Sequence, residues 1–130
     1  MEERMNLEGM TPQEIGRRGE RAASRYLERM DYEIIEHNWE CPAGEADIIA
    51  LDGDTLVFCE VKTRTSLEHG LPVEAVDAQK RSRYEKIAGW YLRDHDYTDM
   101  CVRFDIVALL VVNGERALVR HYVNAFAEVA

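Results

Sequence analysis

Each of two neighbouring apolar segments of this 130-residue chain contains acidic residues. Asp47 lies in the run Gly44–Ala50, and Glu60 and Lys62 follow in the run Val57–Lys62. Two carboxylates and an ammonium group, if brought together, can hold a divalent cation and a water molecule against a phosphodiester. The residue types therefore point to metal-assisted hydrolysis of a phosphodiester bond.

The two runs are predicted to form a β-hairpin around an Asp-Gly-Asp turn. A two-residue loop at positions 53 and 54 puts Asp47 opposite Glu60. A loop that begins one residue earlier puts Glu45 opposite Glu60 instead. Because side chains alternate across a strand with period two, both registers place the same four side chains on one face: Glu45, Asp47, Glu60 and Lys62.

The predicted cluster suits a hard divalent cation. Carboxylates about 5 Å apart repel each other, so a folded protein either protonates one of them or binds a cation between them. Oxygen ligands in a partly open site suit Mg²⁺ or Mn²⁺. Asp47 and Glu60 are expected to bind the metal with the Val61 carbonyl, and Lys62 to orient water or stabilise charge on phosphorus. The alternative interpretation is a set of cross-strand ion pairs at the end of a sheet.

The first helix is predicted over residues 11–30, with Thr11 as N-cap, Pro12 at N1 and Glu14 completing a capping box. Its arginines lie opposite the apolar face. Glu20 falls at the border of that face, where its carboxylate can reach a site between helix and sheet. Glu20 or Glu45 is expected to complete the metal shell or to bind a second ion.

A second helix is predicted from Asp77 to about residue 93, after a loop from residue 64 to 76. Lys80 lies on its apolar stripe and can approach the phosphate alongside Lys62; the alternative is a lysine whose stem packs while its head reaches water. Arginines of both helices and of the loop are candidates for phosphate contacts, unless they only form solvated faces: Arg17, Arg21, Arg64, Arg81 and Arg83.

Strands are predicted over residues 32–40, 45–51, 55–62, 101–112 and 116–123, with Asn113-Gly114 as the turn between the last two. The order of helix, three strands, helix and two strands predicts an α/β fold with a sheet covered on both faces. Residues 1–10 are expected to be a flexible leader, and residues 11–130 a single domain. Arg103 and Asp105 alternate on one strand and are interpreted as a structural pair.

The net charge of −9 argues against a simple nucleic-acid coat protein, although a local basic surface suffices to dock a nuclease. No apolar run approaches the ~20 residues of a membrane span, and the N-terminal residues lack the apolar core of a signal peptide. A cytoplasmic protein without a membrane partner is therefore expected. Three cysteines without CxxC spacing and four scattered histidines favour neither disulfides nor zinc.

Several motifs follow one another in a fixed order: Gly16-Arg17-Arg18-Gly19-Glu20, Gly44-Glu45-Ala46-Asp47-Ile48-Ile49-Ala50, Val57-Phe58-Cys59-Glu60-Val61-Lys62-Thr63-Arg64, Lys80 and Arg103-Phe104-Asp105. From residue 11 to 123 this order resembles the YraN-type family of bacterial proteins, a branch of the PD-(D/E)xK nuclease superfamily close to the archaeal Holliday junction resolvases. The resemblance implies a restriction-endonuclease-like core, a mixed central sheet flanked by helices. It also implies that Asp47, Glu60 and Lys62 form the nuclease motif and that Glu20 is the acidic residue of the resolvases' first helix.

Together these features predict a metal-dependent endonuclease that acts on DNA, with branched or flapped repair intermediates among its candidate substrates. Two alternatives stay open: a nucleic-acid-binding module that keeps the fold without cutting, and a protein-interaction factor. An enzyme that cuts a junction needs two sites and hence a homodimer, although no segment of the sequence marks a dimer interface.

Overall fold

The computed structural model describes residues 2–5, 7, 9–65, 78–97, 99–112 and 116–125. The predicted N-cap Asp77, most of the loop before it and the Asn113-Gly114 turn lie outside these residues. The described strands and helices are, in chain order, β1 (Glu2–Arg4), α1 (Pro12–Arg29), β2 (Glu33–Cys41), β3 (Gly44–Asp52), β4 (Thr55–Arg64), α2 (Ala78–Asp94), β5 (Cys101–Val111) and β6 (Arg116–Tyr122).

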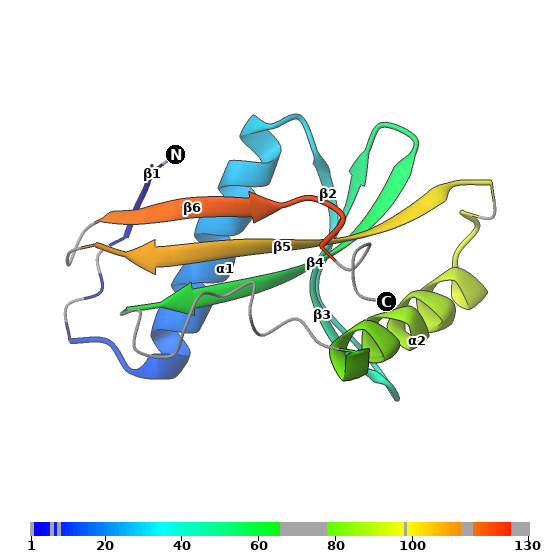
Figure 1. Ribbon diagram of the computed structural model, residues 1–130, viewed down its shortest axis with the longest axis horizontal. Coiled ribbons are helices and arrows are strands. Elements are labelled where there is room, and N and C mark those ends of the chain that lie inside the picture. The colour runs from blue at the N-terminus through cyan, green and yellow to red at the C-terminus, as the bar shows by residue number, and fades with distance from the viewer. Residues whose placement is uncertain are drawn as a thin grey trace.

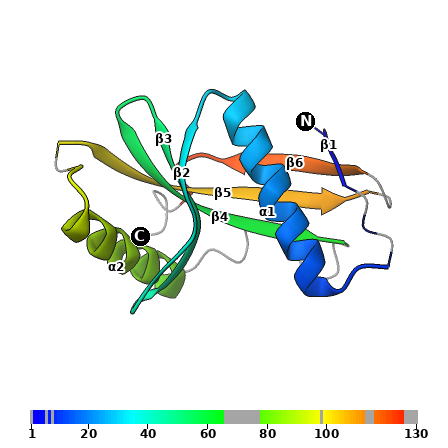
Figure 2. The same ribbon diagram turned by 180° about the vertical axis from the view of Figure 1, so that it is seen from behind.

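These strands form one mixed sheet in the order β1-β6-β5-β4-β3-β2. β4 and β5 run parallel, and each of the other neighbouring pairs is antiparallel. A parallel pair requires a crossover connection, and α2 lies in the chain between β4 and β5. α1 crosses one face of the sheet and α2 lies on the opposite side (Figure 1 and Figure 2). The predicted α/β architecture, a mixed sheet flanked by helices as in a restriction-endonuclease-like core, is confirmed.

Each helix covers its own apolar cluster, so the sheet is buried on both faces. Below α1, Ala22, Ala23 and Leu27 pack against strand residues that include Ile48 and Val107. Below α2, the buried side chains are Ala46, Ile49, Leu56, Phe58, Tyr84, Ile87, Ala88, Tyr91 and Ile106. None of the described helices is both long and apolar enough to cross a membrane.

α1 begins as its sequence predicts and then approaches β4 closely. Thr11 caps the helix, because its hydroxyl accepts a hydrogen bond of 3.2 Å from the Glu14 N–H. Farther along, a Cβ atom at Gly19 would overlap the Thr63 hydroxyl of β4. Only glycine allows this approach, which places the following residue, Glu20, beside the C-terminal part of β4.

Three residues of the segment 1–10, expected to be a flexible leader, belong to the sheet. Glu2–Arg4 forms the edge strand β1, in which Glu3 pairs with Ala117 of β6. The Glu3 side chain is buried and forms ion pairs with Arg25 and Arg29 of α1. Three residues are too few to show a periodicity, so their pairing depends on tertiary contacts that the sequence does not reveal.

Candidate active site

The predicted carboxylates lie where β3 and β4 separate. The two strands pair from Asp52 and Thr55 down to Ile48 and Cys59, which confirms the register with a two-residue loop. Before Ile48, β3 turns toward α2, whereas β4 continues beside β5 (Figure 1). Two residues that are two positions apart on a regular strand lie on the same face. Ala46, however, lies in the apolar cluster under α2, whereas Ile48 lies in the cluster under α1, as expected if the strand turns between them. The resulting fork opens at the positions of the two predicted acids.

Asp47 bridges the fork. Its Oδ2 accepts a hydrogen bond of 2.8 Å from the Val61 N–H of β4. Burial is the main reason why the pKa of this carboxyl rises to about 6, and the hydrogen bond opposes the rise. Three acidic neighbours add to the rise in the pKa: Glu20, Glu60 and Glu45. Asp47 therefore sits among negative charges that favour binding of either a proton or a cation.

Glu60 is buried, with 6% of its surface exposed, and lies between two lysines. Its Oε1 is 3.3 Å from the Nζ of Lys62 and 3.0 Å from the Nζ of Lys80. Its Oε2 is buried and has no hydrogen-bond partner among the described residues. A buried carboxylate oxygen without a partner is costly, so this atom is a suitable ligand position for a cation.

Lys80 reaches Glu60 from α2, while Lys62 reaches it from β4 itself. Burial lowers the pKa of Lys80, and the nearby ammonium group of Lys62 lowers it further. Both lysines therefore meet at one carboxylate oxygen, although they come from different elements. The structure thus brings Lys80 alongside Lys62, where each can contact an anion that enters the fork.

The donor atoms at the fork fit a metal whose remaining ligands are water molecules and substrate phosphates. Among the described residues, no three His, Cys, Asp or Glu side chains are grouped closely enough to hold a metal ion. Mg²⁺, however, is commonly held by one or two carboxylates together with water and substrate phosphates. Asp47 and Glu60, whose Oε2 has no hydrogen-bond partner among the described residues, would supply two such ligands, with the Val61 carbonyl as the predicted third. They suit Mg²⁺ or Mn²⁺ and leave positions for water and phosphate.

Glu20 lies on the α1 side of the fork, and Glu45 lies at its rim. A pocket of about 320 Å³ is lined by Arg17, Glu20, Arg21, His37 and Asn38. The Glu20 charge raises the pKa of both Asp47 and Glu45, so this carboxylate is close to the other acids. Glu45 is exposed and pairs across the strands with Glu40. The predicted acids thus gather, but Glu45 stays in solvent.

The predicted phosphate-binding arginines have different surroundings. Arg17 and Arg21 border the Glu20 pocket. Arg64 is half-buried, and its guanidinium donates a hydrogen bond of 3.4 Å to the carbonyl of the preceding residue. Arg81 is ion-paired with Glu85 at 3.0 Å, and Arg83 lies exposed on the same helix. The five candidate arginines are thus distributed over α1, β4 and α2.

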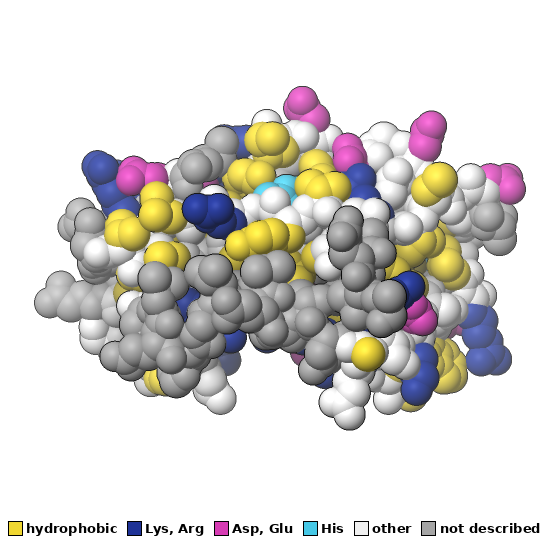
Figure 3. All heavy atoms as spheres, viewed as in Figure 1, with side chains coloured by type: hydrophobic (Ala, Val, Ile, Leu, Met, Phe, Trp, Pro, Cys, Tyr) yellow, Lys and Arg dark blue, Asp and Glu magenta, His cyan; other side chains and the backbone are white. Residues whose placement is uncertain are grey.

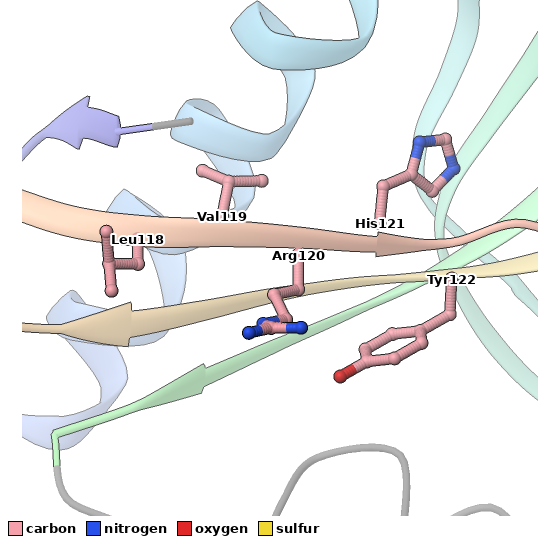
Figure 4. Close-up of a pocket in the computed structure, with 5 residues that line it drawn as sticks. All are labelled: Leu118, Val119, Arg120, His121 and Tyr122. Carbon is pink, nitrogen blue, oxygen red and sulfur yellow. The ribbon is translucent and has the colours of Figure 1, made fainter.

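A larger pocket lies away from the predicted acids. It has a volume of about 380 Å³ and is lined by Leu118–Tyr122 of β6. Figure 4 shows that these side chains alternate, with His121 and Tyr122 pointing to opposite sides of the strand. The His121 Nε2 is 2.7 Å from Asp105, which also binds Arg103 at 2.9 Å. Arg103 and Asp105 are therefore ion-paired, as predicted, within a buried network that holds β5 to β6.

Comparison with known proteins places the chain in a family. Residues 19–109 match the model of the family described as "Uncharacterised protein family UPF0102". A UPF0102 protein of Arthrobacter sp. (strain FB24) is 47% identical over 107 residues, which cover 82% of this chain and 91% of the relative. A UPF0102 protein of Beutenbergia cavernae is 49% identical over 107 residues, which also cover 82% of this chain and 91% of the relative. One from Geobacter sulfurreducens is 42% identical over 86% of this chain and 88% of its own length.

The chain therefore belongs to the UPF0102 family, and the predicted resemblance to the YraN-type family is confirmed. The matched segment begins at Gly19, where α1 meets β4, and extends to Leu109 in β5. It contains Glu20, Asp47, Glu60, Lys62 and Lys80, the residues that surround the fork.

Proposed function

We propose that this protein is a metal-dependent endonuclease that hydrolyses phosphodiester bonds in DNA. The observation that carries the proposal is the environment of Glu60. One of its carboxylate oxygens is buried without a partner in the part of the chain that the structure describes, and the other binds Lys62 and Lys80. Asp47, whose carboxyl pKa is raised, lies next to it across the fork. Acids and lysines in this arrangement can bind both a divalent cation and a phosphate.

Each residue at the fork has a separate role in this reaction. A bound Mg²⁺ or Mn²⁺ supplies a Lewis acid that polarises the phosphate and lowers the pKa of a bound water. Asp47, Glu60 and the Val61 carbonyl hold the cation. Lys62 orients the attacking water or stabilises the negative charge that develops on phosphorus. Lys80 neutralises the phosphate from the side of α2.

The segment matched by the family model contains the residues of the fork. The names of the relatives state no activity. The order of motifs nevertheless resembles that of PD-(D/E)xK nucleases, and the fork contains their two acids and lysine. Since the family resembles a branch of that superfamily close to the archaeal junction resolvases, we include branched and flapped DNA among the proposed substrates.

A cleavage assay tests this function. Linear, flapped and four-way branched DNA would each be incubated with the protein and with Mg²⁺, Mn²⁺ or a chelator. We expect cutting only with metal. Glu60→Ala and Lys62→Ala should each lower the rate by about 10²-fold or more and leave the circular dichroism spectrum unchanged. Glu28→Ala, which removes an exposed acid of α1, is the matched control and should cut at the wild-type rate.

Two results would contradict the proposal. Cutting that survives both Glu60→Ala and Lys62→Ala would come from a contaminant or from another site. Cutting that continues in chelator would exclude the role given to the metal.

A second candidate function is DNA binding without cleavage. Two lysines already neutralise Glu60, and no three acidic side chains among the described residues form a ready metal cage. Under this alternative, the protein binds DNA in chelator with steep salt dependence, and added metal leaves the DNA intact.

A further inference from the structure

The exposed side of α2 carries a stripe of cations around one tryptophan. The stripe, which we call the α2 stripe, consists of Arg83, Lys86, Trp90 and Arg93. Their spacings of three, four and three residues place them on one side of a helix. All are exposed, and 36% of the Trp90 surface is accessible. Figure 3 shows several Lys and Arg side chains over α2.

Trp90 lies in a shallow pocket and has a partly fixed orientation. The pocket has a volume of about 260 Å³ and is lined by Lys86, Gly89, Trp90 and Arg93. The Arg93 guanidinium lies over the indole, 5.3 Å from the ring centroid. A Cβ at Gly89, the residue before Trp90, would meet no atom of the described residues within 4 Å, so the surface at that position is open. The ring is therefore held by a cation next to open space.

An exposed indole flanked by cations suits a ligand with a flat ring and negative charge. The protein has a net charge of −9, so three cations along one side of α2 contrast with the negative charge of the chain as a whole. Of the two acids on the same helix, Glu85 is ion-paired with Arg81, and Asp94 is the last residue of the helix, next to Arg93. Nucleotides combine a stacking face with a phosphate, and base–aromatic stacking tolerates any sequence. In a duplex the bases are stacked inside, so only unpaired nucleotides can stack on this ring.

We propose that the α2 stripe binds unpaired nucleotides of a DNA substrate, with one base stacked on Trp90 and phosphates on the neighbouring cations. This inference rests on the proposed function and specifies its substrate: a duplex that borders a single-stranded segment. Lys80 at the fork and Trp90 are ten residues apart on one helix, a rise of about 15 Å. That length equals about four base steps of a stacked strand. A duplex phosphate at Glu60 can therefore coexist with an unpaired tail at Trp90.

Equilibrium binding in chelator tests the inference without cleavage. The probes are a blunt duplex and the same duplex with a single-stranded tail of about ten nucleotides. Trp90→Ala should weaken binding of the tailed duplex about tenfold and leave binding of the blunt duplex unchanged. Trp90→Phe should restore most of the affinity, because it keeps an aromatic ring. Leu118→Ala, which truncates an exposed apolar side chain on β6, should bind both probes like the wild type.

Two results would overturn the inference: equal affinity of Trp90→Ala and wild type for the tailed duplex, or an equal loss on both probes. The outcomes also separate this inference from the proposed endonuclease. Trp90-dependent binding of the tail by a protein that never cuts would refute the endonuclease alone. If cutting depends on metal, and Trp90→Ala cuts at the wild-type rate with the same preference among DNA substrates, only the proposed role of the α2 stripe is refuted.

Discussion

Asp47 shows how a single side chain couples the fold to the site. Burial and neighbouring acids raise the pKa of its carboxyl from 3.8 to about 6. The folded state therefore holds this proton more tightly than the unfolded state does. The stability gained in this way is fully present below about pH 4 and is lost as the pH rises through 6. At neutral pH, the ionised carboxylate destabilises the protein until a cation binds.

Asp47→Asn should remove this pH dependence, because an amide keeps an acceptor for the Val61 N–H but carries no charge. We expect the variant to be more stable than the wild type near pH 8 by roughly 1–3 kcal/mol and about equally stable near pH 4. Urea unfolding at both pH values, without divalent metal, measures the difference. The same free-energy difference at both pH values would contradict the assigned pKa.

Lys80 competes with a cation for Glu60 in the proposed site, since both are attracted to the same carboxylate. Lys80→Met should therefore tighten binding of Mn²⁺ about tenfold. It should also slow cleavage, because the phosphate loses a positive neighbour. Isothermal titration with Mn²⁺ and a parallel cleavage assay check the two effects. Weaker Mn²⁺ binding in this variant would show that the lysine supports the metal site and does not compete with it.

At the scale of elements, the contact between α1 and β4 sets the position of Glu20. A methyl group at Gly19 would overlap the Thr63 hydroxyl, whereas one at Gly16 would meet no atom within 4 Å. Gly19→Ala should therefore lower the free energy of unfolding by roughly 1–3 kcal/mol, despite the higher helix propensity of alanine. Gly16→Ala is the matched control and should raise it by up to about 1 kcal/mol.

Thermal or urea unfolding of both glycine variants and of Gly19→Ala/Thr63→Ala measures this contact. The second substitution should recover part of the lost stability, because it removes the hydroxyl that the new methyl group meets. If Gly19→Ala were as stable as Gly16→Ala, the close approach of α1 to β4 would be refuted.

Local chemistry explains which elements could be predicted from the sequence. The cap at Thr11 and the turn register at Asp52 and Thr55 depend on residues that are neighbours in the chain, and the structure confirms both. The fork between β3 and β4 depends on packing against α2. Simple alternation assumes a straight strand, so it does not reveal that Ala46 lies under α2.

The candidate site was predictable only in part for the same reason. The pattern of Asp47, Glu60 and Lys62 gives the residue types at the fork. The burial of Glu60 and its contact with Lys80 depend on the packing of β4 against α2, which brings together two residues that are twenty positions apart in the chain. Trp90 does not stand out in the sequence, because its exposure depends on how α2 sits on the sheet.

At the scale of the whole molecule, a net charge of −9 has to be reconciled with a polyanionic substrate. Binding must then depend on local cations, and a limited number of phosphate contacts makes the salt dependence moderate. With about four such contacts, affinity should fall by roughly 10²-fold between about 50 and 200 mM salt. Anisotropy titrations of labelled DNA in chelator measure this slope. An affinity that does not change with salt would favour an apolar interface with a protein partner.

Binding of Mn²⁺ to the protein without DNA tests the central claim most directly, because that claim is that Asp47 and Glu60 together attract a divalent cation. Electron paramagnetic resonance counts bound Mn²⁺ without reference to activity. We predict one site in the wild type and in Glu28→Ala, and loss of that site in Asp47→Ala and in Glu60→Ala, with all four proteins folded. Equal binding of Mn²⁺ by all four proteins, or none by the wild type at millimolar concentration, would contradict the account.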